Sequence, residues 1–225
     1  MHSEEYKLDN PVWHSLSETH NQYVVEYNDT KFYHPDFCPF GGTTSPGHTA
    51  DAILRYADTC NNFFLVGNKP VTPDNVHIKK ELVCDQMIIH NTINIPYASN
   101  IIQLKETHTN DLLTLVNLVQ PGYFKNKTPQ LGNYFGIYID NVLAAVTGER
   151  MKMDLFTEVS AVITHPDHTG QGYAKQLVAH TVNNIIQQGK TPYLHVADTN
   201  TGAIALYKKL GFATRRKISF WNMVS

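Results

Sequence analysis

A short glycine-containing segment, residues 165–177 (HPDHTGQGYAKQL), connects two contrasting sequence patterns. Before it, residues 157–164 alternate in polarity and contain several β-branched side chains, which predicts a strand. After it, apolar residues recur at helical spacing as far as Gly189, which predicts a long helix with a glycine at its end. The chain is therefore expected to pass from a strand directly into a helix through two glycines, Gly170 and Gly172.

Two glycines at a strand-to-helix junction favour an anion-binding site. The first N–H groups of a helix have no partner within the helix, and the helix dipole adds positive potential there. Glycine removes the side chain that would keep a pyrophosphate away from the backbone. A tight turn without any ligand would show the same pattern. The sequence matches neither of two nucleotide-binding motifs. Lys175 stands at the sixth position of the G-x-G-x-x-G dinucleotide fingerprint, where glycine is required, and no GxxxxGK[ST] segment is present.

The charge distribution favours a small polyanionic ligand over nucleic acid. The chain of 225 residues has a formal net charge of −2, whereas nucleic-acid-binding domains are usually strongly basic. Residues 165–225 carry seven basic and two acidic side chains, a net charge of +5, while residues 1–164 carry eleven basic and eighteen acidic ones, a net charge of −7. Ordinary solvated surfaces are the alternative explanation of this asymmetry.

The composition is that of an ordinary globular protein, with 42% hydrophobic and 17% charged residues. No apolar run approaches the length of a membrane span, and the N-terminal segment is acidic, so we expect a cytoplasmic protein without a membrane partner.

Cys38, Cys60 and Cys84 lie far apart and are expected to be reduced and buried. No metal site is expected, because of the twelve histidines only His165 and His168 are closely spaced in a candidate loop.

Residues 1–97 are predicted to form a separate N-terminal α/β unit. Asn10 followed by Pro11 is typical of a helix start, and this helix is expected to run to about Asn21. The other elements predicted in this unit are a strand at 23–27, a long loop at 29–48, a helix at 50–60, strands at 62–66 and 86–90, and a linker at 91–100.

Residues 98–225 are predicted to form a second domain. Gly211 is expected to adopt a left-handed conformation at the end of its last helix, with Phe212 making the hydrophobic contact that accompanies such a cap. The predicted elements are strands at 101–104, 133–140, 142–147, 157–164, 192–196 and 218–223, and helices at 110–119, 172–189 and 203–210.

The order of motifs in this second domain resembles the GNAT superfamily of acyl-coenzyme A dependent N-acetyltransferases. A strand leads into His-Pro-Asp and Gly-x-Gly-Tyr-Ala, followed by a long helix, a strand, Asn200-Thr-Gly-Ala and Leu-Tyr207-Lys-Lys-Leu-Gly-Phe. The resemblance covers residues 101–225. It implies an α/β fold with a mixed, mainly antiparallel sheet that splays into a V and is flanked by helices. The N-terminal unit is then interpreted as a degenerate half of the same fold that packs against the second domain and shapes the acceptor site.

The resemblance also implies the reaction, transfer of an acetyl group from acetyl-coenzyme A to a primary amine. Tyr207 matches the tyrosine that acts as general acid toward the coenzyme sulfur, although a tyrosine that only packs in the core is the alternative. Glu158 is expected to be the base or to orient the amine. His195 is expected to be a satisfied, half-buried histidine near the acyl pocket. The residues expected to bind the coenzyme are Ala161, Val162, Ile163, Thr169, Gly170, Gln171, Gly172, Tyr173, Ala174 and Asn200.

Two departures from the family pattern lead us to expect weakened coenzyme binding. Thr169 stands where the family loop usually has arginine, and Asp167 stands where glutamine or arginine is common. The acceptor class stays open between a small amine or amino acid, a protein N-terminus or lysine, and an antibiotic, because acceptor choice resides in variable loops. The competing function is a non-catalytic module that binds or senses acyl-coenzyme A. Nucleic acid is not expected as a partner, and the oligomeric state is left open.

Overall fold

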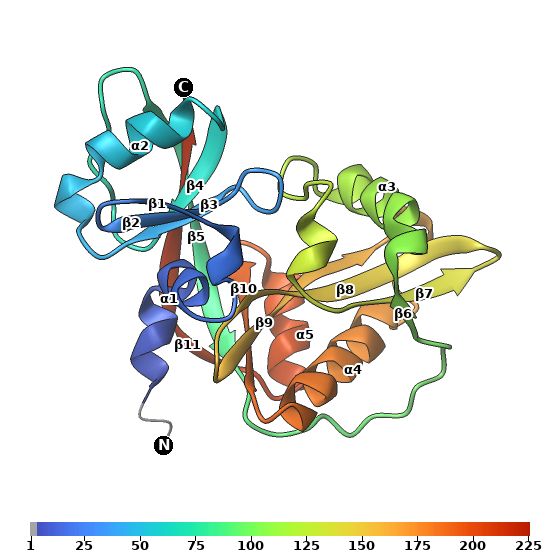
Figure 1. Cartoon of the computed structure of the whole chain (residues 1–225). Helices are drawn as coiled ribbons and strands as arrows, with labels where there is room; N and C mark the ends of the chain where they lie inside the picture. The colour runs from blue at the N-terminus through green and yellow to red at the C-terminus, as the bar shows by residue number, and fades with distance from the viewer. Residues whose placement is uncertain (1–3) are drawn as a thin grey trace.

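The computed structural model describes residues 4–225 and joins all of their strands in one continuous sheet (Figure 1). The strands are β1 (Val24–Tyr27), β2 (Thr30–Tyr33), β3 (Phe40–Thr43), β4 (Asn62–Val66), β5 (His77–Ile88), β6 (Ile102–Leu104), β7 (Tyr134–Ile139), β8 (Val142–Lys152), β9 (Phe156–Thr164), β10 (Thr191–Ala197) and β11 (Ala213–Val224). Their order across the sheet is β1-β2-β3-β4-β11-β5-β10-β9-β8-β7-β6. The β3–β4 and β9–β10 neighbours are parallel, and the other described neighbours are antiparallel. The expected mixed, mainly antiparallel sheet is confirmed.

Five α-helices and six short 3₁₀ segments accompany this sheet within residues 4–225. The α-helices are α1 (Pro11–Ser17), α2 (Ala50–Ala57), α3 (Thr109–Val119), α4 (Tyr173–Gln187) and α5 (Thr201–Lys209). The 3₁₀ segments are η1 (Glu5–Asp9), η2 (Asn21–Tyr23), η3 (Pro46–His48), η4 (Glu106–His108), η5 (Thr128–Leu131) and η6 (Pro166–His168). None of the described helices is both long and apolar enough to cross a membrane.

The alternation of side chains along β7 directs two helices to opposite faces of the sheet (Figure 1). Tyr134 packs in a buried cluster with Leu112 and Leu115 of α3. Its neighbour Phe135 packs instead in a cluster that contains Leu177 of α4. Both faces of this part of the sheet are therefore covered, which leaves the edges and ends of the strands as the places where a ligand can approach.

The N-terminal and C-terminal parts of the chain share strands rather than lying side by side as separate sheets. β5 lies between β11 and β10, with Gln86 opposite both Arg216 and His195. The sheet therefore continues across residue 97, and the division of the chain at that point stays a prediction.

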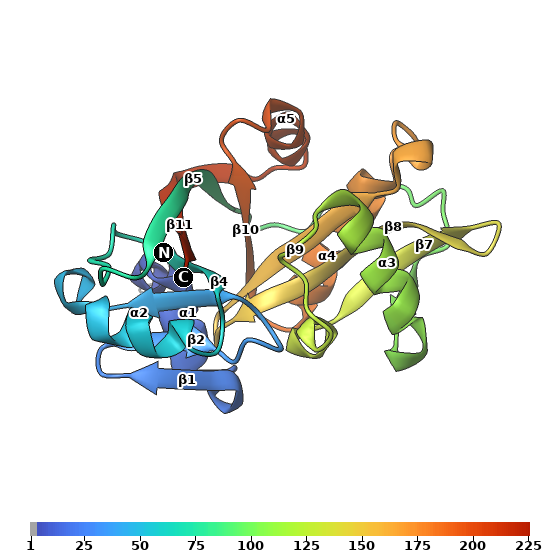
Figure 2. The same ribbon diagram turned by 90° about the horizontal axis from the view of Figure 1, so that it is seen from above.

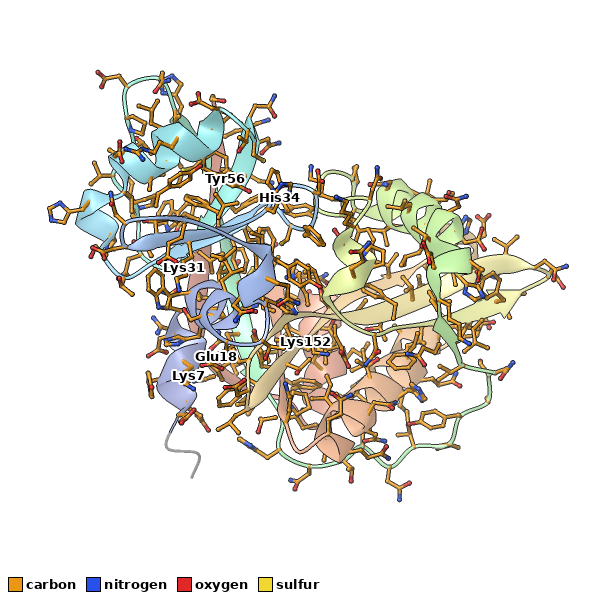
Figure 3. All side chains as sticks on the ribbon, in the orientation of Figure 1. Lys7, Glu18, Lys31, His34, Tyr56 and Lys152 are labelled. Atoms are coloured by element: carbon orange, nitrogen blue, oxygen red, sulfur yellow. The ribbon has the colours of Figure 1, made fainter. Side chains whose placement is uncertain are left out.

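Polar contacts at α1 add to this junction. Ser15 Oγ donates to the carbonyl of Lys152 at 2.8 Å, and Lys7 and Glu18 form an ion pair of 2.8 Å nearby. Figure 3 labels Lys7, Glu18 and Lys152 along this contact. The end of β8 is thereby tied to a helix from the other end of the sequence.

The predicted loop at residues 29–48 was wrong, because this segment contains β2 and β3. β3 contains two glycines, Gly41 and Gly42, and because glycine is uncommon in strands the sequence pattern does not predict a strand there. A Cβ on Gly42 would lie 2.6 Å from Asn10 Oδ1 and 2.9 Å from the Trp13 backbone nitrogen, so glycine is needed where α1 crosses the strand. The contact with α1 therefore requires glycine within this strand, whereas in a sequence pattern a glycine indicates a loop.

Several predicted element lengths were also corrected. β5 begins at His77 rather than at residue 86, because charged side chains on its exposed face obscure the strand pattern and pairing with β11 stabilises it. β8 and β11 likewise exceed their predicted ranges, and α1 ends at Ser17 instead of Asn21. The three cysteines are free as expected, but Cys60 is partly exposed rather than buried.

Candidate active site

The two parallel strands β9 and β10 separate halfway along their length, as Figure 2 shows. Their register runs from Phe156 opposite Thr191 to Glu158 opposite Tyr193 and then ends. β9 continues to Thr164, whereas the remainder of β10 pairs only with β5 on its other side. The V-shaped splay expected from the sequence is confirmed, and Glu158 lies at its vertex.

A bulge in β9 lies just beyond this vertex. Ser160 is opposite Gly148 in β8, but the next register pair is Ile163 opposite Val146, so β9 contains one extra residue there. Ala161 adopts a left-handed φ of 49°, which is uncommon for a residue with a side chain. The bulge turns the backbone of Ala161 and Val162 out of the ladder with β8 and toward the splay. Ile163 instead lies in the buried cluster beneath α3.

A cavity of about 340 Å³ occupies the splay. It brings together six residues that the sequence singled out: Glu158, Ala161, Val162, His195, Asn200 and Tyr207. The walls that the sequence did not predict come from several elements and include Phe40, Leu82, Cys84, Gln120, Tyr123, Arg150, Ser160, Val196, Ala203 and Phe220.

A larger cavity of about 520 Å³ lies elsewhere, beside α3. Leu104, Lys105 and Tyr134 are among its lining residues. It contains none of the predicted site residues, so the splay cavity is the candidate active site.

Tyr207 is positioned in the splay cavity by the cap at the end of α5. Phe212 N–H donates to the carbonyl of Tyr207 and Gly211 N–H to that of Lys208, with Gly211 at a φ of 101°. This is the predicted glycine cap, and the rings of Tyr207 and Phe212 pack edge to face at 5.9 Å. Among residues 4–225 the Tyr207 hydroxyl has no hydrogen-bond partner, and burial raises the pKa of Tyr207 to about 12. The phenol therefore stays protonated at neutral pH and is available to a ligand.

Asn200 caps the opposite end of the same helix. Its Oδ1 accepts a hydrogen bond of 3.1 Å from the backbone N–H of Ala203, as an N-cap residue does. Both Asn200 and Ala203 line the splay cavity. The capping role expected for Asn200 is therefore present, and its contact with the coenzyme stays a prediction.

The glycine loop lies outside the cavity and is open to solvent. Gly170 and Gly172 adopt φ angles of 78° and 76°, a left-handed conformation that favours glycine, and Gly172 is the N-cap of the 15-residue helix α4. A Cβ at either position would have no atom of the described chain within 4 Å. Thr169 and Gln171 are exposed, whereas Tyr173 and Ala174 are half-buried in the first turn. The space above the helix start is therefore accessible to an anion.

Glu158 forms a buried, two-pronged ion pair with Arg150 of β8. The distances are 2.7 Å from Arg150 Nε to Oε2 and 2.8 Å from Nη2 to Oε1, and the Glu158 side chain is 1% exposed. Burial by itself would raise the pKa of Glu158, but the charge and hydrogen bonds of Arg150, with a hydrogen bond from His195, lower it to about 2. A carboxylate with so low a pKa is a weak base at neutral pH.

His195 is held in one tautomer by its neighbours. Gln86 Oε1 accepts from Arg215 and its Nε2 donates to the carbonyl of Leu8, which fixes the orientation of the amide. The same Nε2 lies 3.1 Å from His195 Nε2, so this ring nitrogen accepts a hydrogen bond and carries no proton. The proton is therefore on His195 Nδ1, which donates to Glu158 Oε1 at 2.8 Å. Both nitrogens of His195 are satisfied, in agreement with the sequence-based expectation.

Comparison with known proteins identifies the family. The family described as FR47-like protein matches residues 134–221. A crystal structure of a GNAT-family protein from Novosphingobium aromaticivorans is 30% identical in sequence, covers 97% of this chain and 98% of its own, and has a TM-score of 0.88. The chain belongs to the GNAT superfamily. In this GNAT fold the splay and the bulge in β9 border the cavity that Tyr207 lines, and the glycine loop lies outside it.

More distant structures share the fold alone. A GCN5-related N-acetyltransferase-like protein from Streptococcus suis is 14% identical, with a TM-score of 0.65, and the match covers 94% of this chain and 92% of that one. A GCN5-related N-acetyltransferase from Kribbella flavida is 14% identical, with a TM-score of 0.63, and covers 99% and 96% of the two chains. A comparison with curated proteins returned no match.

Arg150 is the most consequential cavity residue that the sequence analysis missed. The predicted strand ended at residue 147, so Arg150 was not assigned to an element. A second register shift, between Glu149 opposite Val159 and Lys152 opposite Thr157, changes the course of β8 at this position. The available signal was an arginine three residues beyond an apolar strand pattern, after Gly148 and Glu149.

Proposed function

We propose that the protein is an N-acetyltransferase that moves an acetyl group from acetyl-coenzyme A to a primary amine. The observation that carries this proposal is the cavity in the β9–β10 splay. It is lined by Tyr207, whose hydroxyl has no hydrogen-bond partner in the described part of the chain, and by the Arg150–Glu158 pair. The family of the chain supports the same reaction class, because its 30% identical relative is a GNAT-family structure.

The donor binds along the outer side of β9 in this proposal. The glycine loop at residues 169–174 and the start of α4 hold the pyrophosphate through backbone N–H groups, since both glycines leave the backbone open. Thr169 supplies a hydroxyl where many relatives supply arginine, so binding relies more on the backbone. The bulge at Ala161 and Val162 lies between this loop and the cavity, and its peptide groups orient the thioester carbonyl. Acetyl-coenzyme A supplies the activated acyl group.

Tyr207 and Glu158 have different roles in the proposed reaction. As the acceptor amine forms its C–N bond and the C–S bond of the thioester breaks, the Tyr207 hydroxyl donates a proton to the departing sulfur. Because Glu158 is a weak base, its carboxylate positions the ammonium group instead. The ammonium loses one proton to water to become the attacking amine, and a second proton leaves through water as the C–N bond forms. The phenolate of Tyr207 is reprotonated by that route, so the enzyme is unchanged after each turnover.

The N-terminal part of the chain contributes to the acceptor side of the cavity. Phe40 from β3, together with Leu82 and Cys84 from β5, lines the wall opposite α5. Burial raises the pKa of Cys84 to about 12, so this thiol is an apolar wall residue rather than a nucleophile. The first 97 residues therefore act as a flank that shapes the acceptor site in this proposal.

A direct assay tests the proposal against a non-catalytic coenzyme-binding module. Purified protein is incubated with acetyl-coenzyme A and a mixed panel of primary amines, and both free thiol and acetylated product are measured. We expect thiol release that depends on the amine, with product mass increased by one acetyl group. Tight acetyl-coenzyme A binding without transfer to any amine, at protein concentrations that allow single turnovers, would favour the binding module.

A further inference from the structure

The guanidinium group of Arg150 has hydrogen-bonding capacity that Glu158 does not use. Of its five N–H groups, one on Nε and one on Nη2 donate to the carboxylate. Arg150 makes no other hydrogen bond to residues 4–225. The remaining N–H groups, two on Nη1 and one on Nη2, include a second fork of the geometry that binds a carboxylate through two parallel hydrogen bonds.

The Arg150 side chain borders the splay cavity. The Arg150 side chain is 17% exposed and lines the cavity together with Ser160 and Ala161 of the bulge. The guanidinium carbon lies 4.6 Å from the centre of the Phe40 ring, and this stacking, with the ion pair to Glu158, holds the group in place. A ligand carboxylate bound here would lie next to the part of β9 where acyl transfer is proposed.

The charges of the cavity favour such an anion and disfavour a polycation. Among the described residues that line it, Arg150 and Glu158 are the basic and acidic side chains, and both nitrogens of His195 already have hydrogen-bond partners. Both oxygens of Glu158 already accept hydrogen bonds from Arg150 or His195. The described lining offers an acceptor with several ammonium groups only the one carboxylate of Glu158, whereas an acceptor with a carboxylate would find the free fork of Arg150.

The size and walls of the cavity limit the acceptor further. Its volume of about 340 Å³ is at the lower end of the range of about 300–1,000 Å³ for small-molecule sites, and the acetyl end of the donor must share it. The side chains of Phe40, Leu82 and Phe220 provide an apolar and aromatic wall. These features suit a compact amine with an apolar body.

We infer that the acceptor is a free amino acid with an apolar side chain, recognised by its carboxylate at the second fork of Arg150. This inference rests on the proposed acetyltransferase function and specifies its acceptor. A protein N-terminus lacks a carboxylate next to its amine, and a lysine side chain of a protein lacks one as well. Arg150 thus selects free amino acids over both.

The first test uses the unchanged protein and matched ligands. L-Phenylalanine is compared with L-phenylalaninamide and with phenethylamine, and L-leucine with L-leucinamide. Binding is measured by calorimetry in the presence of coenzyme A, and transfer by thiol release from acetyl-coenzyme A. We expect the amino acids to bind at least tenfold more tightly than their amides or decarboxylated forms, and kcat/KM to follow the same order.

The second test changes the arginine. Arg150→Lys keeps the positive charge beside Glu158 but removes the second fork, so the preference for the acid over the amide should fall at least tenfold. Arg55→Lys is the matched control, because Arg55 also pairs through its Nε with a carboxylate, Asp51, but lies exposed on α2 far from the cavity. The control should keep the preference of the original protein.

The outcomes separate the acceptor inference from the proposed function. Acetyl transfer to amides or simple amines as rapid as to the amino acids would overturn the inference and leave the acetyltransferase function standing. Carboxylate-dependent binding without any transfer would support the Arg150 site and contradict the proposed function. Absence of amino-acid binding in the unchanged protein would overturn the inference, whether or not Arg150→Lys folds.

Discussion

Glu158 and Tyr193 form the last register pair between β9 and β10, and the two strands separate immediately beyond them. The Tyr193 hydroxyl donates to the carbonyl of Met151 at 2.8 Å, which holds the vertex of the splay against β8. Glu158 meets Arg150 and His195 at the same level. The point where the sheet opens is thus also the point where buried charges are paired.

Replacing Glu158 is expected to destabilise the protein more than it impairs proton transfer. Glu158→Gln leaves the buried charge of Arg150 without a counter-ion, which typically costs about 3–5 kcal/mol. Chemical denaturation measures the loss. The double variant Glu158→Leu with Arg150→Met should recover much of the stability, because it removes both charges. A stable Glu158→Gln protein with a lost pH-dependent step in kcat would instead identify Glu158 as the base.

Tyr207→Phe is expected to lower kcat by a factor of about 10² to 10⁴ with coenzyme affinity within a few fold. The ring still packs against Phe212, and the lost hydroxyl has no hydrogen-bond partner within residues 4–225, so thermal stability should be unchanged or slightly higher. Single-turnover kinetics and a melting curve check the two halves of this prediction. An unchanged rate when chemistry limits would leave Tyr207 a purely structural residue.

Gly172→Asp is expected to weaken coenzyme A binding at least tenfold, about 1.4 kcal/mol, because it adds a side chain and a negative charge at the helix start. Gly189→Asp is the matched control. Gly189 has nearly the same φ, 75° against 76°, and equally open surroundings, but lies at the other end of α4. Both variants place a side chain at a left-handed φ, and the helix dipole should make Gly189→Asp the less stable of the two, yet calorimetry should show that only Gly172→Asp loses affinity. Equal affinities would place the pyrophosphate elsewhere.

His20 is expected to make stability depend on pH below about 6.5. It is 3% exposed, its Nε2 donates to the carbonyl of Leu131, and its Nδ1 accepts from Tyr33. Burial lowers the pKa of His20 to about 4, whereas an unfolded histidine has a pKa of about 6.5. Between these values the unfolded chain binds more protons, so stability is complete above pH 6.5 and falls as pH falls toward 4.

The His20→Gln variant isolates this contribution. Its amide keeps one donor and one acceptor but does not titrate. Urea denaturation at pH 7 and pH 5 should show a loss in the original protein that exceeds the loss in the variant by about 2 kcal/mol. His14 and His180, whose pKa values burial also lowers, contribute equally to both proteins. Identical losses would show that His20 is protonated without cost.

A fragment of residues 98–225 is not expected to fold as a soluble monomer. It lacks β5, which lies between β10 and β11, and would expose the edges of both strands. Size-exclusion chromatography and circular dichroism test the fragment, and co-expression with residues 1–97 should restore solubility. A folded, monomeric fragment that binds coenzyme A would show that the predicted boundary at residue 97 separates independent domains.

The sequence by itself determined the features that depend on neighbours in the chain. The strand at 156–164, the helix from Tyr173, the asparagine cap at Asn200 and the glycine cap at Gly211 all follow from local spacing and backbone preference. These local rules were sufficient to place the glycine loop and Tyr207 in their order along the chain. That order of motifs resembles the GNAT pattern and led to the family.

Only the tertiary structure decided which distant residues meet. The partnership of Arg150 with Glu158 depends on a bulge in β8, and the tautomer of His195 depends on Gln86, 109 positions earlier in the chain. The insertion of β5 between β10 and β11 likewise joins segments more than a hundred residues apart. Spacing and periodicity describe a residue's own element, whereas strand pairing between distant segments depends on the packing of the whole sheet. That packing brought Phe40, Leu82 and Cys84 to the wall of the cavity.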